Sequence, residues 1–272
     1  MTSAVTPAAA LADGRSRRSR ARRRSGYLVL ALTLGLFAAL YAALAPSHSA
    51  VAANGTALEV SRGRALYLVG CSTCHGLQAQ GTKIAPSLIG VGAAAVDFQV
   101  GTGRMPLQRM GPEAQRKQPK YTQPQINALA AYIASLAPGP AIPAADQLDI
   151  SKGDPARGGN LFRANCAQCH NFNGSGGALT EGKYAPSLYP STSKQIYEAM
   201  LNGPEQMPVF GDNQLSPQDK LDIITFLKTT HAQADPGGFG LGRIGPVSEG
   251  LVAWLVGTGV LVFATLWIGA RI

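Results

Sequence analysis

"GCSTCHG" at residues 70–76 and "NCAQCHN" at residues 165–171 carry the same C-x-x-C-H pattern, and their four cysteines are the only ones in the chain. Two thiols three positions apart lie on one side of a helical turn, where they can reach the two vinyl groups of a porphyrin. The histidine that follows can then ligate the iron. The sequence therefore predicts two covalently bound haem c groups, held at Cys71, Cys74, His75, Cys166, Cys169 and His170.

Two other uses of paired cysteines have to be weighed. A lone C-x-x-C can be a thiol–disulfide redox pair, but here each of two copies is followed directly by a histidine. Two pairs can also build a four-cysteine zinc site, but Cys74 and Cys166 are much further apart than the pairs of a compact zinc ribbon. Haem attachment accounts for all four cysteines and leaves none over.

The chain contains an internal repeat around these motifs. The first copy reads "RGRALYLVGCSTCHG", "KIAPSLIG" and "GRMP", and the second reads "RGGNLFRANCAQCHN", "KYAPSLYP" and "EQMP". The landmarks follow in one order, which predicts a duplicated unit: module 1 at residues 55–137 and module 2 at residues 150–232. The segment 138–149 between them is rich in proline and alanine and is expected to be a stiff, extended linker.

Each module is predicted to end in a helix, "QPQINALAAYIASL" in the first and "SPQDKLDIITFLKTT" in the second. Apolar residues recur in both at helical spacing and are expected to pack in the core. Asp154 before Pro155 has the pattern of a helix N-cap, and so does Ser216 before Pro217, with Asp219 completing a capping box.

On these motifs each module resembles a small mono-haem cytochrome c domain of the all-helical kind. The resemblance implies an all-α fold in which a few helices surround one haem, and the porphyrin supplies much of the apolar core. The whole chain is expected to be two tandem cytochrome c domains with a transmembrane helix at each end.

Such domains usually hold the iron between histidine and methionine, which raises the reduction potential and closes the iron to small ligands. Met105 and Met207 stand at matching places before a proline and are the predicted sixth ligands. Met200 falls inside an apparent helix and is expected to pack in the core, whereas Met110 has no counterpart in the second copy.

Pro86 and Pro186 resemble a family proline whose backbone carbonyl accepts a hydrogen bond from the axial histidine. The two spacings from the histidine differ, and an ordinary turn proline is the alternative.

His48 and His231 lie outside the expected ligand positions. They leave bis-histidine ligation open for one module.

The net charge of +9 is concentrated in a basic tail, residues 1–26, which carries seven arginines and one acid. The rest of the chain is nearly neutral, and its predicted topology disfavours nucleic-acid binding.

An uncharged run follows the tail, and residues 27–46 are predicted to be a transmembrane helix, or a signal-anchor that is not cleaved. A cleaved signal peptide remains the alternative.

A second apolar run makes residues 249–270 a predicted span, with Trp254 and Trp267 toward its two interfaces. The glycine-rich segment 233–248 would connect it to module 2. The arginine-rich tail places the N-terminus inside, so the haem modules face the extracytoplasmic side of the plasma membrane and both termini are cytoplasmic.

The layout as a whole resembles the di-haem cytochrome c subunit of the actinobacterial menaquinol–cytochrome c reductase, a cytochrome bc-type complex. The resemblance implies a respiratory electron-transfer subunit, without catalytic residues beyond its haems, inside a translocase supercomplex. Its implied partners are the cytochrome b subunit, the Rieske iron–sulfur subunit and a haem–copper cytochrome c oxidase. The alternatives are an anchored di-haem carrier for another oxidase or dehydrogenase, a di-haem peroxidase, which needs an open iron, and a haem sensor.

Overall fold

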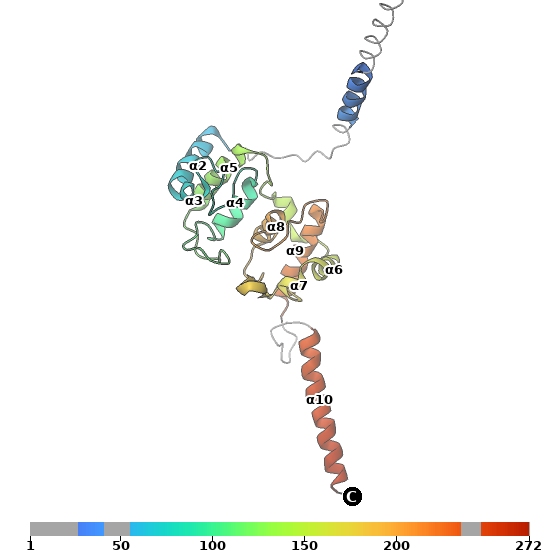
Figure 1. The fold of residues 1–272 in the computed structure, drawn as a ribbon. Coiled ribbons are helices and arrows are strands. Elements are labelled where there is room, and N and C mark those ends of the chain that lie inside the picture. Colours follow the sequence, from blue (N-terminus) through green and yellow to red (C-terminus); the bar gives the residue numbers. More distant parts are fainter. Residues whose placement is uncertain (1–26, 41–54, 235–245, 272) are drawn as a thin grey trace, which may run out of the picture. The chain divides into compact units, whose positions relative to one another are not determined.

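The computed structural model describes residues 27–40, 55–234 and 246–271. The chain divides into two compact units, Met1–Ser49 and Ala50–Ile272, and the second unit contains both modules (Figure 1).

Module 1 is built from four helices in the predicted order. They are α2 (Ala57–Gly70), α3 (Ser72–His75), α4 (Gly92–Gly101) and α5 (Gln123–Leu136). α5 begins and ends with the segment expected from its apolar spacing. Its N-cap Thr122 and Gln125 form a capping box, as Thr56 and Glu59 do for α2. α2 packs against α5, and α4 packs against α5 as well.

Module 2 repeats this order with α6 (Pro155–Asn165), α7 (Ala167–His170), α8 (Ser193–Asn202) and α9 (Pro217–Ala232). The expected caps are confirmed: the Asp154 carboxylate accepts hydrogen bonds from two backbone amides at the start of α6. Ser216 and Asp219 form a capping box at the start of α9. α6 packs against α9, as α2 does against α5.

The modules differ in the segment after the haem-binding motif. Module 2 carries a small antiparallel hairpin of β1 (Gly177–Ala178) and β2 (Tyr184–Ala185), joined through the 3-10 turn η3 (Thr180–Gly182). The all-helical expectation therefore holds apart from these two short strands. The linker is extended only in its first part, because its end forms the 3-10 turn η1 (Ala145–Leu148), which packs against α9. A second 3-10 turn, η2 (Ile150–Lys152), begins module 2 and also packs against α9.

Each module has its own apolar core where the first and last helices cross. A tilted aromatic pair lies at both crossings, Tyr67 with Tyr132 in module 1 and Phe162 with Phe226 in module 2, with ring centroids 5.3 and 5.6 Å apart. Tyr67 and Phe162 are buried, and each stands four residues before the first cysteine of its motif. The repeat seen in the sequence is therefore also a repeat of packing.

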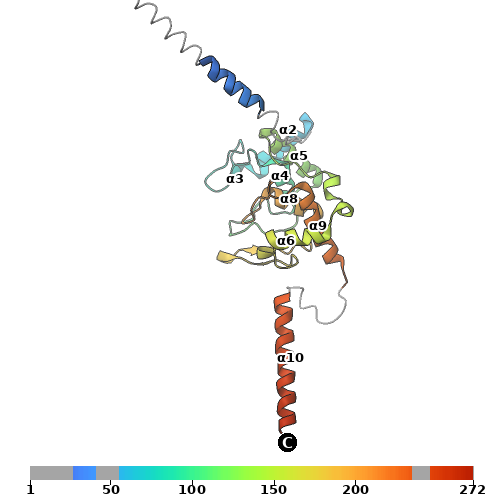
Figure 2. The ribbon, with the colours of Figure 1, turned by 90° about the vertical axis from the view of Figure 1, so that its right-hand side faces the viewer.

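The two modules touch through α4 and α8, which lie side by side in both views (Figures 1 and 2). An ion pair joins Lys194 of α8 to Asp97 of α4, with 2.5 Å between the charged atoms. Asp97 is buried and also accepts a hydrogen bond from Gln123. Asp97 thus ties the contact between modules to the start of α5.

Helix α10 (Pro246–Gly269) contains one stretch long and apolar enough to cross a membrane, Glu249–Gly269, with mean hydropathy 2.2. Its large apolar side chains are exposed, as a lipid-facing helix requires. The Arg271 guanidinium stacks on Trp267, 4.6 Å from the ring centroid.

The other expected span is described only over the exposed helix Tyr27–Leu40. At about 1.5 Å per residue, its 14 residues are too short to cross a bilayer of about 30 Å. Residues 41–46 of the predicted span lie outside the described residues, as does His48.

Candidate functional site: two haem-binding motifs

The cysteines of each motif lie where one helix ends and a single helical turn begins. Cys71 is the C-cap of α2 and the N-cap of α3, and Cys166 has the same place between α6 and α7. Both are half-buried, whereas Cys74 and Cys169 are exposed, and all four are free thiols. The same arrangement of one half-buried and one exposed thiol on a helical turn therefore occurs in both modules.

Burial raises the pKa of the first cysteine thiol in each motif. It raises the pKa of Cys71 to about 11 and that of Cys166 to about 12, and in each case the second cysteine of the motif adds a smaller rise. Both groups are therefore neutral thiols at neutral pH.

The histidine of each motif is held by a proline carbonyl. The Nδ1 atom of His75 lies 2.8 Å from the carbonyl oxygen of Pro86, and that of His170 lies 3.0 Å from the carbonyl oxygen of Pro186. A carbonyl accepts only from a protonated Nδ1, so this contact fixes the tautomer that leaves Nε2 as the ligand atom. The prolines therefore have the place that the resemblance implied.

The unequal spacing from histidine to proline has a structural cause. The separation is 11 residues in module 1 and 16 in module 2, because the β1–β2 hairpin lies inside the second loop. The loop closes in the same way on both sides: the Gly81 amide donates to the His75 carbonyl at 2.8 Å, and the Gly176 amide donates to the His170 carbonyl at 3.0 Å.

Gly81 and Gly176 are positioning residues that the motif analysis missed. Their φ angles are +84° and +86°. A Cβ at Gly81 would lie 2.6 Å from the Ser87 amide nitrogen, and a Cβ at Gly176 would lie 2.6 Å from the Ala185 carbonyl oxygen. The signal was present in the sequence, since both glycines stand six residues after the axial histidine. Only the loop geometry explains why glycine is needed there.

Met105 and Met207 both pack at the edge of their module's apolar core. The loop of Met105 is clamped by Lys117, whose ammonium donates to the carbonyls of Arg104 and Pro106 at 3.2 and 2.8 Å. Met200 is buried in α8 as predicted, and Met110 is exposed. In module 1 these placements favour Met105 over Met110, whereas in module 2 Met200 and Met207 both line the cavity described below, and Met207 is preferred for its match with Met105 in the repeat.

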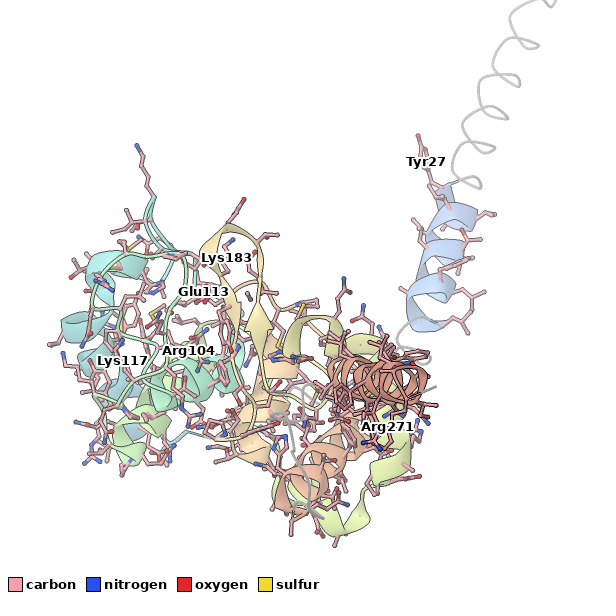
Figure 3. All side chains as sticks on the ribbon, turned by 90° about the horizontal axis from the view of Figure 1, so that it is seen from below. Tyr27, Arg104, Glu113, Lys117, Lys183 and Arg271 are labelled. Carbon is pink, nitrogen blue, oxygen red and sulfur yellow. The ribbon has the colours of Figure 1, made fainter. Side chains whose placement is uncertain are left out.

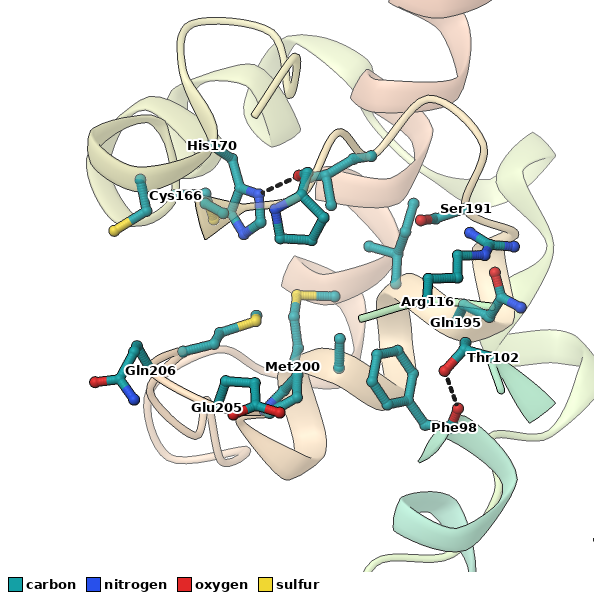
Figure 4. Close-up of a pocket in the computed structure, with 18 of the residues that line it drawn as sticks. Phe98, Thr102, Arg116, Cys166, His170, Ser191, Gln195, Met200, Glu205 and Gln206 are labelled. Atoms are coloured by element: carbon teal, nitrogen blue, oxygen red, sulfur yellow. Dashed lines mark hydrogen bonds between the residues drawn. The ribbon is translucent and has the colours of Figure 1, made fainter. Parts of the chain in front are cut away.

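A cavity of about 370 Å³ lies beside the second motif, and its lining includes Cys166, Cys169, His170, Pro186 and Met207. Figure 4 shows His170 on one side of the cavity and Met200 on the other, with Cys166 at one end and Arg116 at the opposite end.

The donor atoms around this cavity suit an iron porphyrin. Two thiols, one imidazole with Nδ1 already hydrogen-bonded, and the thioethers of Met200 and Met207 line a space that is otherwise mainly apolar. Burial lowers the pKa of His170, and the Pro186 carbonyl partly opposes this effect, so the imidazole is the neutral form that binds metal.

His170 is the only histidine among the described residues that line this cavity. His231, the other candidate in module 2, has its Nε2 atom 2.9 Å from the Asn173 carbonyl oxygen and its ring edge-on to Tyr189. These contacts give His231 a structural place in α9 and favour Met207 as the second axial group.

Part of this cavity wall comes from the other module, which sequence reasoning did not foresee. Phe98, Arg104, Ala114 and Arg116 of module 1 line the cavity beside the motif of module 2. A motif identifies the residues next to it in the chain, but not the residues that a neighbouring module brings to it.

Two repeated helical modules, each with a pair of thiols, a carbonyl-bound histidine and a methionine at the edge of its core, define a tandem c-type cytochrome. Residues 60–137 match the family model "Cytochrome c", and residues 153–227 match "Cytochrome C oxidase, cbb3-type, subunit III". Proteins of this class carry covalently bound haem c.

Full-length relatives narrow the class further. The chain is 48% identical to the cytochrome bc1 complex cytochrome c subunit of Corynebacterium efficiens over 267 residues, which cover 92% of this chain and 90% of the relative. It is 44% identical to the Mycobacterium tuberculosis protein of the same name, over 95% of each chain. The chain belongs to the family of cytochrome bc1 complex cytochrome c subunits.

Proposed function

We propose that this chain is the di-haem c electron-transfer subunit of a respiratory menaquinol–cytochrome c reductase. The observation that supports the proposal is the duplication of a thiol pair followed by a carbonyl-bound histidine, in a chain with a membrane-length C-terminal helix. The haems supply the redox chemistry when bound, and the chain supplies their position and potential.

The proposed ligands are those of the motifs. Thioether bonds form at Cys71, Cys74, Cys166 and Cys169, and the axial pairs are His75 with Met105 and His170 with Met207. A methionine in the sixth position closes the iron to small molecules, which suits electron transfer and disfavours a peroxidase.

The proposed partners follow from the family. Electrons would enter from the Rieske iron–sulfur subunit, which assembles with the cytochrome b subunit, and leave to a haem–copper oxidase. The chain would take part in the enzyme as one subunit and would cross the plasma membrane twice, at residues 27–46 and 249–270, with both modules outside. Retention at the membrane would keep the haems close to partners that are themselves membrane-bound.

A redox difference spectrum of the tagged chain, purified in mild detergent from its native membrane, tests the assignment. We expect b- and a-type haem bands to accompany the c-type bands, and a menaquinol analogue to reduce them. If c-type haem alone appears under gentle solubilisation, the anchored carrier for another oxidase or dehydrogenase replaces the reductase subunit.

The axial assignment predicts separate effects of two substitutions. Met105→His and Met207→His should each lower the reduction potential of one haem and leave the other in place, because imidazole stabilises ferric iron relative to a thioether. A potentiometric titration of each variant measures this. Met110→His, at an exposed position, is the matched control and should change neither potential. Two unchanged potentials in both axial variants would refute the assignment.

A further inference from the structure

The wall that module 1 contributes to the module 2 cavity is held in place by specific contacts. The Ala114 amide donates to the Glu205 carboxylate at 3.0 Å, and the Tyr184 amide donates to the Glu113 carboxylate at 2.8 Å. Figure 3 shows Glu113 beside the hairpin that carries Lys183. These reciprocal bonds dock the segment 104–116 of module 1 against module 2, so its cavity-lining residues belong to the site.

Two of these residues are arginines whose charges the chain does not neutralise. Within the described ranges, no ion pair is formed by Arg104 or Arg116. Arg104 stacks on Phe98 at 4.8 Å from the ring centroid, and Arg116 donates only a long bond of 3.4 Å to the Pro190 carbonyl. Glu113 and Glu205 line the same cavity, but within the described residues neither forms an ion pair with these arginines.

Two neighbouring guanidinium groups at the wall of a mainly apolar cavity indicate an anionic ligand. Arg104 is half-buried, whereas Arg116 is exposed at the cavity wall, and a planar guanidinium matches a carboxylate with two parallel hydrogen bonds. The two nearby glutamates already accept hydrogen bonds from backbone amides of the facing module. A ligand with carboxylates of its own would accept hydrogen bonds from the guanidinium groups, with which these glutamates form no ion pair.

The position of the arginines within the cavity identifies that ligand. Haem carries its two propionates on the half of the ring opposite its vinyl groups, and the vinyl groups are where the cysteines attach. Cys166 lies at one end of the cavity and Arg116 at the opposite end (Figure 4). We propose that Arg104 and Arg116 of module 1 bind the propionates of the haem attached to module 2. This inference rests on the proposed function, because it requires a haem in each module.

The consequence is a link between the two haem sites. Arg104 directly precedes Met105, the proposed axial ligand of module 1, and Lys117, which clamps that methionine loop, directly follows Arg116. The segment that completes the second site is thus the one that positions the sixth ligand of the first. Haem binding in module 2 also strengthens the contact between the modules.

Potentiometric titration of the full-length chain, purified in detergent with its haems, tests the inference through Arg104→Gln and Arg116→Gln. In both variants the potential of the module 2 haem should fall, because a lost positive charge stabilises ferric over ferrous iron. That potential should also become more dependent on pH, since a propionate freed from its cation can take up a proton. Arg116→Lys keeps the positive charge, so the module 2 haem should retain a potential close to that of the unsubstituted chain.

Controls separate this inference from the function on which it depends. Arg109→Gln removes the same charge from an exposed position in the same segment and should leave both potentials unchanged. The Met207→His variant identifies which titration wave belongs to module 2. If Arg116→Gln leaves that wave at its original potential and pH dependence, or moves only the module 1 wave, the propionate assignment is wrong. If the unsubstituted chain lacks two titrating c-type haems, the proposed function itself fails.

Discussion

At the scale of single residues, the site depends on groups that orient the ligands. The C-x-x-C-H motif supplies an imidazole, but the Pro86 and Pro186 carbonyls select its tautomer. Those carbonyls reach the ring only because Gly81 and Gly176 let each loop fold back on the histidine backbone. The motifs predict the ligands, and the geometry identifies the residues that orient the two histidines.

Gly176→Ala is expected to weaken the bond between His170 and Pro186. Its Cβ would lie 2.6 Å from the Ala185 carbonyl oxygen, at a φ angle of +86°. A weaker bond makes the imidazole less basic, so the potential of the module 2 haem should rise, and stability should fall by about 1 kcal/mol or more.

The potential is measured by titration and the stability by denaturation. Gly182→Ala is the matched control, because its φ angle is +73° but a Cβ there meets nothing within 4 Å. If Gly182→Ala shifts the potential as much as Gly176→Ala does, backbone strain in the hairpin would explain the effect, and the histidine bond would not.

At the scale of elements, each module contains the same kind of helix crossing, in which its first helix passes close to its last. Gly63 of α2 and Gly158 of α6 stand eight residues before the first cysteine of their motifs. A Cβ at either would lie 1.9 Å from a carbonyl oxygen of the facing helix, that of Ala128 in α5 or of Asp222 in α9. Close approach of the helix backbones fixes where each motif emerges, and with it the direction of the axial histidine.

Gly63→Ala and Gly158→Ala should therefore each destabilise one module. The added methyl group forces the helices apart, and overpacking of this kind costs about 1–3 kcal/mol. Chemical denaturation followed at the haem absorption of each variant measures the loss. Gly101→Ala, at the end of α4 where a Cβ meets nothing within 4 Å, should be close to neutral. Equal stability of Gly101→Ala and Gly158→Ala would contradict the close crossing.

At the scale of the whole molecule, charge is buried where the modules meet. Glu198 of α8 is fully buried, and in the described part of the chain neither of its carboxyl oxygens has a hydrogen-bond partner. Burial, and secondarily the Asp97 carboxylate, raise its pKa to about 9, against which Lys194 acts only weakly. Glu198 is therefore protonated in the folded protein at neutral pH.

This gives stability a defined pH dependence. Between the ordinary pKa of glutamate, about 4.3, and about 9, the folded state holds a proton that the unfolded state has lost, so the free energy of unfolding falls as pH rises. Glu198→Gln should remove this contribution and gain relative stability on the alkaline side. Denaturation curves across this range measure it, with exposed Glu181→Gln as the control. An unchanged slope in Glu198→Gln would contradict the buried proton.

Membrane attachment also belongs to this scale. A chain ended after residue 245 lacks α10, yet we expect it to stay in the membrane fraction, because residues 27–46 are proposed to remain as a second span. Fractionation of the truncated chain, with the full chain as control, measures this. Release into the soluble fraction would show that the N-terminal segment does not anchor the protein.

The sequence by itself determined the covalent chemistry, the duplication, the helix caps and the membrane-length C-terminal helix. Each of these is local: it depends on residues within one or a few helical turns, where spacing along the chain is spacing in the structure. Cys166, His170 and Ser216 were identified for this reason.

Only the tertiary structure decided what distant segments do to one another. It brought Arg104 and Arg116 to the cavity of the other module, buried Glu198 against Asp97, and showed Gly63 and Gly158 at helix crossings. Contacts of this kind depend on how packed surfaces meet after the chain has folded back on itself. That arrangement is fixed by the summed packing of many side chains, and a single motif does not encode it.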